Sequence, residues 1–124
     1  MRTLIDCLYV GAGGLLGTIL RYLAGLLPVQ RDGGFPFMTL AINVTGAFLI
    51  GLITALATQG AGIRPRALLF CRVGVCGGFT TFSTFALEAH SLLRGGKPLI
   101  GAAYAALSVA LCIAAVACAN ALAE

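Results

Sequence analysis

Four apolar stretches of about twenty residues constrain the fold of this chain more than any other feature of its sequence. A helix of that length crosses about 30 Å of hydrocarbon. With a mean hydropathy of +1.02 and 10% charged residues, the 124-residue chain is too apolar for a soluble domain of its size. We therefore predict an all-α integral membrane protein that forms a single transmembrane domain, residues 1–124, with spans at about 4–26, 38–58, 67–93 and 99–121.

The basic residues of the chain divide evenly between the two ends of a four-span bundle. If the spans alternate in direction, one side receives Arg2, Arg64, Arg66 and Arg72, and the other receives Arg21, Arg31, Arg94 and Lys97. The Lys/Arg bias of short loops sets the direction of insertion, so an unbiased chain has no strong instruction. Four short helices also enclose little interior. The sequence thus predicts insertion in both orientations and an antiparallel homodimer; a single fixed orientation is the alternative.

The third span contains a stretch that a helix filling only lipid would not carry. Gly77 and Gly78 are followed by Phe-Thr-Thr-Phe-Ser-Thr-Phe-Ala-Leu-Glu, residues 79–88. Each glycine costs about 1 kcal/mol in a helix interior. Backbone released from helical bonding at membrane depth is tolerated only where it is buried in protein or lines a wet cavity. We predict that the third helix breaks at or near the two glycines and that the break forms a transport or ion site.

Aromatic and hydroxyl side chains recur at helical spacing after these glycines. Phe82 and Phe85 lie on one row. A neighbouring polar row holds Thr81, Thr84 and Glu88. The edge of an aromatic ring is positively polarised, so two phenylalanines turned edge-on attract an anion weakly without a fixed charge. Core packing is the alternative role for the two rings.

Polar residues in the other spans extend this pattern. Asn43 lies in the second span one turn after Thr39, Tyr104 and Ser108 share a row of the fourth span, and Arg21 lies near the end of the first span. Asn43 is either a ligand of a transported ion or an interhelical hydrogen-bond clamp. The row of Tyr104 and Ser108 faces other helices of the protein, or else the tyrosine lies at the membrane interface and the serine bonds to the backbone of its own helix. Arg21 either snorkels to the interface or concentrates anions at a pore mouth.

The cysteines do not predict a disulfide or a metal site. The sequence has five, scattered through apolar stretches and never in Cys-x-x-Cys spacing, and His90 is the sole histidine. We expect the cysteines to be small apolar packing residues, because a soft-metal site lacks partners.

Residues Gly74 to Phe85, Gly-Val-Cys-Gly-Gly-Phe-Thr-Thr-Phe-Ser-Thr-Phe, resemble the signature of the Fluc/CrcB fluoride channels. Gly13 to Tyr22 and Thr39 to Asn43 support the resemblance, which covers the whole chain. It implies a passive fluoride-selective channel that exports fluoride across the bacterial inner membrane and relieves its toxicity. It also implies an antiparallel dual-topology homodimer with two pores. The partners implied for this chain are the fluoride ion, membrane lipid and a second copy of the chain. Nucleic acid is not expected as a partner.

The resemblance also assigns roles to single residues. The backbone carbonyls of Gly77 and Thr80 would hold a central structural Na⁺. The fluoride pathway would be formed by Phe82, Phe85, Asn43, Ser83, Thr84, Tyr104 and Ser108, with Arg21 and Glu88 in the vestibule. Cys112 stands where similar channels often continue the polar track with a hydroxyl, and a thiol is a weaker donor.

Two other classes of membrane protein compete with this prediction. A small dual-topology proton-coupled multidrug transporter would use Glu88, which is the central candidate for its membrane-embedded carboxylate. A non-transporting assembly subunit would fit the small residues but not the polar third span. The sequence has no nucleophile and base pair, metal cluster or phosphate loop, so we do not expect an enzyme.

Overall fold

The chain folds as an all-helical bundle in the part that the structure, a computed structural model, describes: residues 1–29 and 34–124. Its elements are α1 (Arg2–Gly25), α2 (Phe37–Thr58), α3 (Pro65–Leu68), the π-helix η1 (Leu69–Cys76), α4 (Gly77–Phe79), α5 (Phe82–Arg94) and α6 (Pro98–Ala123). The stretches long and apolar enough to cross a membrane are α1, α2, the run Pro65–Arg94 and α6. The predicted all-helical membrane protein with four spans is confirmed.

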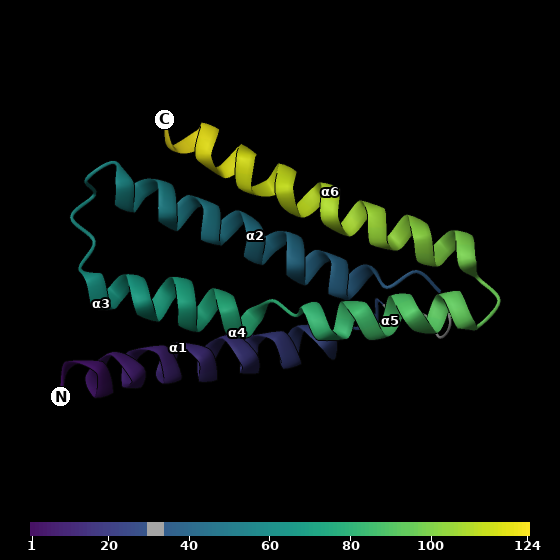
Figure 1. Cartoon of the computed structure of the whole chain (residues 1–124), viewed down its shortest axis with the longest axis horizontal. Helices are drawn as coiled ribbons and strands as arrows, with labels where there is room; N and C mark the ends of the chain where they lie inside the picture. Colours follow the sequence, from purple (N-terminus) through teal and green to yellow (C-terminus); the bar gives the residue numbers. More distant parts are fainter. Residues whose placement is uncertain (30–33) are drawn as a thin grey trace.

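Successive spans run in opposite directions, and both termini lie at the same end of the bundle (Figure 1). The first span packs against η1 and α4, and α2 packs against α6. The α5 segment also packs against α6, so the third span contacts the first span with its first half and the fourth span with its second half. Arg31, which we counted in the charge balance, lies outside the described residues.

The helix boundaries follow local chemistry. Pro65 and Pro98 stand at the first turns of α3 and α6, where a missing N–H costs nothing and the fixed φ suits the helix. Gly96 has a φ of 78° in the turn between α5 and α6, a conformation that side-chain-bearing residues rarely adopt. These signals set the points at which the chain reverses direction.

Of the two glycines at the start of the central stretch, Gly78 serves close helix packing, and open space surrounds Gly77. Gly77 and Gly78 are helical and belong to α4. A Cβ at Gly78 would come within 2.6 Å of the Gly14 carbonyl oxygen, so only glycine allows α4 to approach α1 this closely. The α4 helix ends at Phe79, one residue after Gly78, so the interruption lies near the two glycines and not at them.

A single copy buries little of its own surface. Between 11% and 22% of the residues in each span window are buried within one copy. A small core of Ala89, Leu92 and Tyr104 joins α5 to α6, with Phe85 packed against it. Most large apolar side chains therefore face outward, where lipid or another protein surface covers them in the membrane.

Candidate functional site

Thr80 and Thr81 are extended residues between α4 and α5, and we call them the extended pair. Thr80 has φ −79° and ψ 155°, and Thr81 has φ −147° and ψ 107°. Thr81 is the N-cap of α5, where its hydroxyl accepts a hydrogen bond of 3.2 Å from the Thr84 N–H. The hydroxyl and the N–H of Thr80 both donate to the Cys76 carbonyl, at 2.9 and 3.0 Å. Threonine thus supplies a local partner on each side of the interruption.

The side-chain amide of Asn43 pairs the backbone of Thr81, the second residue of the extended pair. Its Oδ1 accepts from the Thr81 N–H at 2.8 Å, and its Nδ2 donates to the Thr81 carbonyl at 3.1 Å. The N–H and the carbonyl of Thr81 are therefore both hydrogen-bonded to one side chain of the neighbouring helix α2. In a β-sheet a partner strand would bond the same two groups. One of the two Nδ2 hydrogens is used in this contact, so a second remains for another acceptor.

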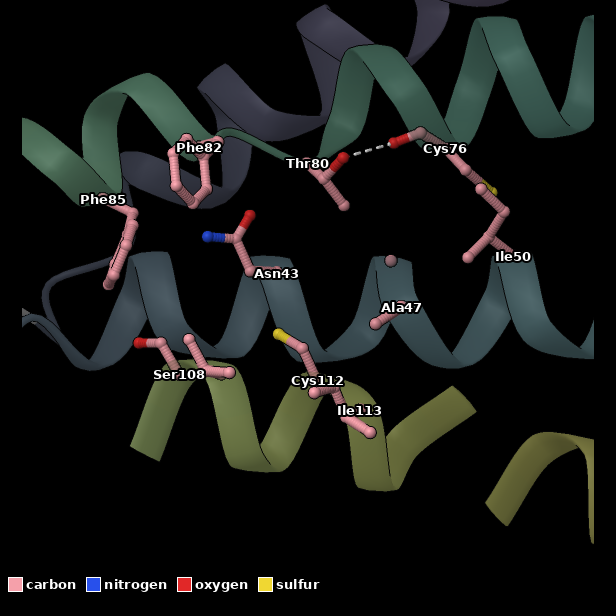
Figure 2. Close-up of a pocket in the computed structure, with 12 residues that line it drawn as sticks. Asn43, Ala47, Ile50, Cys76, Thr80, Phe82, Phe85, Ser108, Cys112 and Ile113 are labelled. Carbon is pink, nitrogen blue, oxygen red and sulfur yellow. Dashed lines mark hydrogen bonds between the residues drawn. The ribbon is translucent and has the colours of Figure 1, made fainter. Parts of the chain in front are cut away.

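A cavity of about 400 Å³ opens beside Asn43, between α2, α5 and α6, and we call it the first cavity. Figure 2 shows Phe82 and Phe85 on α5 to one side of Asn43. It shows Ser108 and Cys112 on α6, the helix next to α2. Its walls are formed by Asn43, Gly46, Ala47, Ile50, Cys76, Thr80, Phe82, Phe85, Ser108, Val109, Cys112 and Ile113. None of these side chains is charged.

Phe82, Phe85 and Ser108 give the first cavity its chemical character. The Phe82 and Phe85 ring centroids are 5.3 Å apart with the planes inclined by 46°, and Phe82 is 78% exposed. The Ser108 side chain is 6% exposed, and its Oγ has no hydrogen-bond partner among the described residues. An unpaired buried hydroxyl is costly unless a ligand or water occupies the adjoining space. The first cavity is thus suited to a small polar guest.

Tyr104 is turned away from the first cavity. It is fully buried, and its hydroxyl donates to Glu88 Oε2 at 2.7 Å. The Thr39 hydroxyl donates to the other carboxylate oxygen, Oε1, at 2.8 Å. Because a phenol has a single proton, Tyr104 in this arrangement has only lone pairs left to offer elsewhere. Glu88 therefore ties α2, α5 and α6 together.

A second cavity of about 420 Å³ lies between α1, α2 and α5. Arg21, Thr84 and Glu88 are among the residues that line it, so a guanidinium and a carboxylate face the same space. The Arg21 Nε donates to the Gly78 carbonyl at 3.1 Å, at the C-terminal end of α4 where carbonyls lack helical partners. Arg21 consequently both holds the first half of the third span and places positive charge in the second cavity.

The predicted site residues therefore separate into distinct groups. Asn43, Phe82, Phe85 and Ser108 line the first cavity, and Arg21, Thr84 and Glu88 line the second. Thr80 lies at the interruption and lines the first cavity, while Gly77 lies in α4 with open space where a Cβ would be. Tyr104 is buried against Glu88, and Ser83 is exposed, with its Oγ 3.4 Å from the Thr81 Oγ1.

Some residues of the site were not among the predicted ones. Thr39 was noted only for sharing a helix face with Asn43, and Thr81 only for its polar row, yet both bond to predicted site residues. The position of Thr81 just before the aromatic run is a typical N-cap signal. Cys112 was expected next to the polar track, but nothing in the sequence pattern indicates that Cys76 lines the same cavity.

Comparison with known proteins gives one family. The model of the family described as "CrcB-like protein, Camphor Resistance (CrcB)" matches residues 8–120. A fluoride-specific ion channel FluC of Rhizobium meliloti is 49% identical over 110 residues, covering 88% of each chain. The protein of the same name from Chlorobium luteolum is 44% identical over 85% of this chain and 81% of its own length. That of Ruminiclostridium cellulolyticum is 42% identical over 94% and 90%. The chain is a multi-pass membrane protein that belongs to the CrcB family.

Proposed function

We propose that this chain forms a passive, fluoride-selective channel that releases fluoride across the bacterial inner membrane and so relieves its toxicity. The observation that carries the proposal is the first cavity, where neutral hydrogen-bond donors and aromatic rings surround an unpaired buried hydroxyl, that of Ser108. Three relatives that cover most of the chain carry the name fluoride-specific ion channel FluC.

The chemistry of the first cavity suits fluoride. Fluoride is small and tightly hydrated, so a selective path must replace its water while excluding the larger chloride. The free Nδ2 hydrogen of Asn43 and the Ser108 hydroxyl are donors, and the edges of Phe82 and Phe85 add weak positive potential. The absence of charged side chains from the lining keeps binding weak enough for the ion to leave.

The second cavity has the properties of a vestibule. Arg21 raises the local concentration of anions, and Thr84 offers a hydroxyl near the extended pair. Glu88 opposes anion binding by its charge but accepts the protons of Thr39 and Tyr104. We infer that Glu88 sets the orientation of these hydroxyls, and that Tyr104 joins the pathway only if it exchanges this bond.

We propose further that two copies assemble antiparallel, each inserted in the opposite direction, with the interrupted third spans at the centre. Gly78 and Thr81 already give their carbonyls to Arg21 and Asn43. The carbonyls of Gly77 and Thr80 stand where helical bonding ends, and neutral oxygens of this kind suit a hard cation such as Na⁺. A second copy would contribute each carbonyl again. The Na⁺ would supply fixed positive charge and hold the two interruptions together.

No coupled energy source is required for export. Hydrogen fluoride that crosses the membrane from acid surroundings dissociates inside the cell. A negative-inside potential then drives the anion out with about 2.3 kcal/mol per charge for each 100 mV. A proton-coupled drug transporter would instead need Glu88 free to exchange protons, whereas both of its oxygens accept hydrogen bonds.

Ion efflux from liposomes tests the channel directly. Purified protein is reconstituted into vesicles loaded with fluoride or chloride, beside a Phe82→Ile, Phe85→Ile variant and a Leu87→Ile control on the same helix but outside both cavities. We expect rapid fluoride efflux with negligible chloride efflux, lost in the double variant and kept in the control. Exchange of protons for a lipophilic cation, with no fluoride efflux, would overturn the proposal in favour of the drug transporter.

A further inference from the structure

Cys112 lies on the wall of the first cavity, one helical turn after Ser108 on α6. It is partly exposed, and Figure 2 shows its sulfur directed toward the side of the cavity where Asn43 lies. The other thiol that lines this cavity, Cys76, is only 3% exposed. Cys112 is therefore the thiol that a guest in the first cavity meets.

Ser108 indicates independently that a guest belongs beside Cys112. Its hydroxyl is more than nine-tenths buried and lacks a hydrogen-bond partner among the residues the structure describes. A buried hydroxyl in this state is satisfied by something in the cavity that it lines. Because residues at i and i+4 share a helix face, whatever satisfies Ser108 passes next to the Cys112 sulfur.

We propose that Cys112 is a binding site for soft, two-coordinate metal ions, and that a metal held there blocks the anion path. This inference rests on the proposed function, since the block is of the fluoride conduction assigned to the first cavity. Thiols select soft metals over hard ones. A two-coordinate ion needs one protein sulfur and keeps its second ligand, so the clusters of three or more ligands that the described residues lack are not required.

Mercury(II) chloride illustrates the chemistry. It is neutral and linear, so the uncharged lining of the first cavity does not repel it. The S–H bond of Cys112 and one Hg–Cl bond break, an S–Hg bond forms, and a proton and a chloride ion leave. The side chain becomes S–Hg–Cl, two heavy atoms longer, and projects from α6 toward α2. Asn43 and Ser108 then face the adduct in place of an ion.

Fluoride efflux with mercury(II) chloride as the probe tests the site. The wild type is compared with Cys112→Ser and with a variant that keeps only Cys112, carrying Cys7→Ser, Cys71→Ser, Cys76→Ala and Cys118→Ser. Each rate is divided by the rate of the same protein without mercury, so that changes in basal conduction cancel. A Cys76→Ala single variant serves if the four-fold variant does not fold.

We expect mercury to reduce efflux at least about tenfold in the wild type and in the proteins that retain Cys112, with recovery on adding dithiothreitol. Efflux by Cys112→Ser should keep most of its rate. Equal inhibition of Cys112→Ser, or no inhibition of the Cys112-only and Cys76→Ala proteins, would overturn the proposal.

Mass spectrometry of the treated protein separates this inference from the proposed function. Mercury on the peptide that contains Cys112 shows that the site exists, whether or not the protein conducts fluoride. If the wild type moves no fluoride, the proposed function fails and the block fails with it, while the adduct still decides the metal site. An unmodified Cys112 in a protein that conducts fluoride would refute the site alone.

Discussion

Asn43 shows how one side chain can serve both the backbone and an ion. Its oxygen and one of its amide hydrogens pair with Thr81, so the interruption between α4 and α5 depends on it. The remaining amide hydrogen is the group that can meet an anion in the first cavity. The two roles that the sequence left open, an interhelical clamp and an ion ligand, are therefore compatible, and the clamp is present in the structure.

Asn43→Asp should disable the protein through this contact. A carboxylate can accept from the Thr81 N–H but cannot donate to its carbonyl, so two oxygens would face each other where 3.1 Å now separates donor from acceptor. We expect a loss of about 1–3 kcal/mol in unfolding free energy and at least a tenfold drop in fluoride efflux. Unfolding in detergent and liposome efflux measure the two effects. A fully active and stable Asp variant would contradict the role of the clamp.

Tyr104→Phe tests the hydroxyl that Glu88 holds. Loss of a hydrogen bond to a charged group should destabilise the protein by about 1.5–3 kcal/mol, measured by unfolding in detergent. Tyr9→Phe is the matched control, because Tyr9 is 41% exposed and keeps its ring near Arg66. Combining Tyr104→Phe with Glu88→Gln should cost less than the sum of the single changes, since the two groups share one bond. If the losses of stability of the two single variants added up in the double variant, Tyr104 and Glu88 would not share a hydrogen bond.

At the scale of elements, the third span combines two packing partners. Its first half lies against α1 through glycines, and its second half lies against α6 through the core around Tyr104. The extended pair lets the two halves meet different neighbours, and Asn43 pairs the N–H and the carbonyl of Thr81 that helical bonding no longer satisfies. The π-helix η1 belongs to the first half. Wide helical turns of this kind are often found near functional sites in proteins.

Gly78→Ala should separate α4 from α1. The new Cβ would lie 2.6 Å from the Gly14 oxygen and 3.1 Å from its Cα, and both atoms belong to backbone that cannot rotate away. Overpacking of this kind costs about 1–3 kcal/mol, visible as a lower melting temperature in detergent. Gly11→Ala is the control, because open space surrounds that position and alanine favours a helix. Similar melting temperatures for both variants would show that α1 and α4 are not closely packed.

For the whole molecule, the arrangement of the ends determines how topology can be tested. Both termini lie at one end, so a reporter fused at the C-terminus records the orientation of the entire bundle (Figure 1). That end also carries the ion pair between Arg66 and Asp6, with 3.1 Å between the Nε and Oδ1 atoms. Asp6 partly offsets Arg66, although acidic residues contribute little to orientation.

Reporter fusions should detect both orientations. We expect comparable signals from a C-terminal reporter active only inside the cell and from one active only outside. Three lysines added after Glu124 should favour a cytoplasmic C-terminus. We expect the ratio of the inside signal to the outside signal to rise at least about tenfold, equivalent to about 1.4 kcal/mol. Fluoride efflux should then fall and return when a copy fixed in the opposite orientation is co-expressed. A strong bias in the unmodified chain would refute dual topology.

The class of this protein follows from local features of its sequence. Four apolar stretches of spanning length are local features, because each residue contributes its hydrophobicity whatever its neighbours in space are. The polar and aromatic stretch after Gly78 likewise identified the region of the site and carried the family resemblance. These conclusions needed no knowledge of how the helices pack.

The hydrogen bonding of the site depends on how the helices pack against one another. The sequence predicted an interruption at or near Gly77 and Gly78; in the structure Gly78 contacts α1, and the chain is extended two residues later, at the extended pair. It likewise pairs Tyr104 with Glu88 and directs Cys112 into the first cavity. The reason is physical: a buried polar group takes whichever partner another helix brings within reach. That choice depends on helix rotation and separation, which sequence spacing along one helix does not fix.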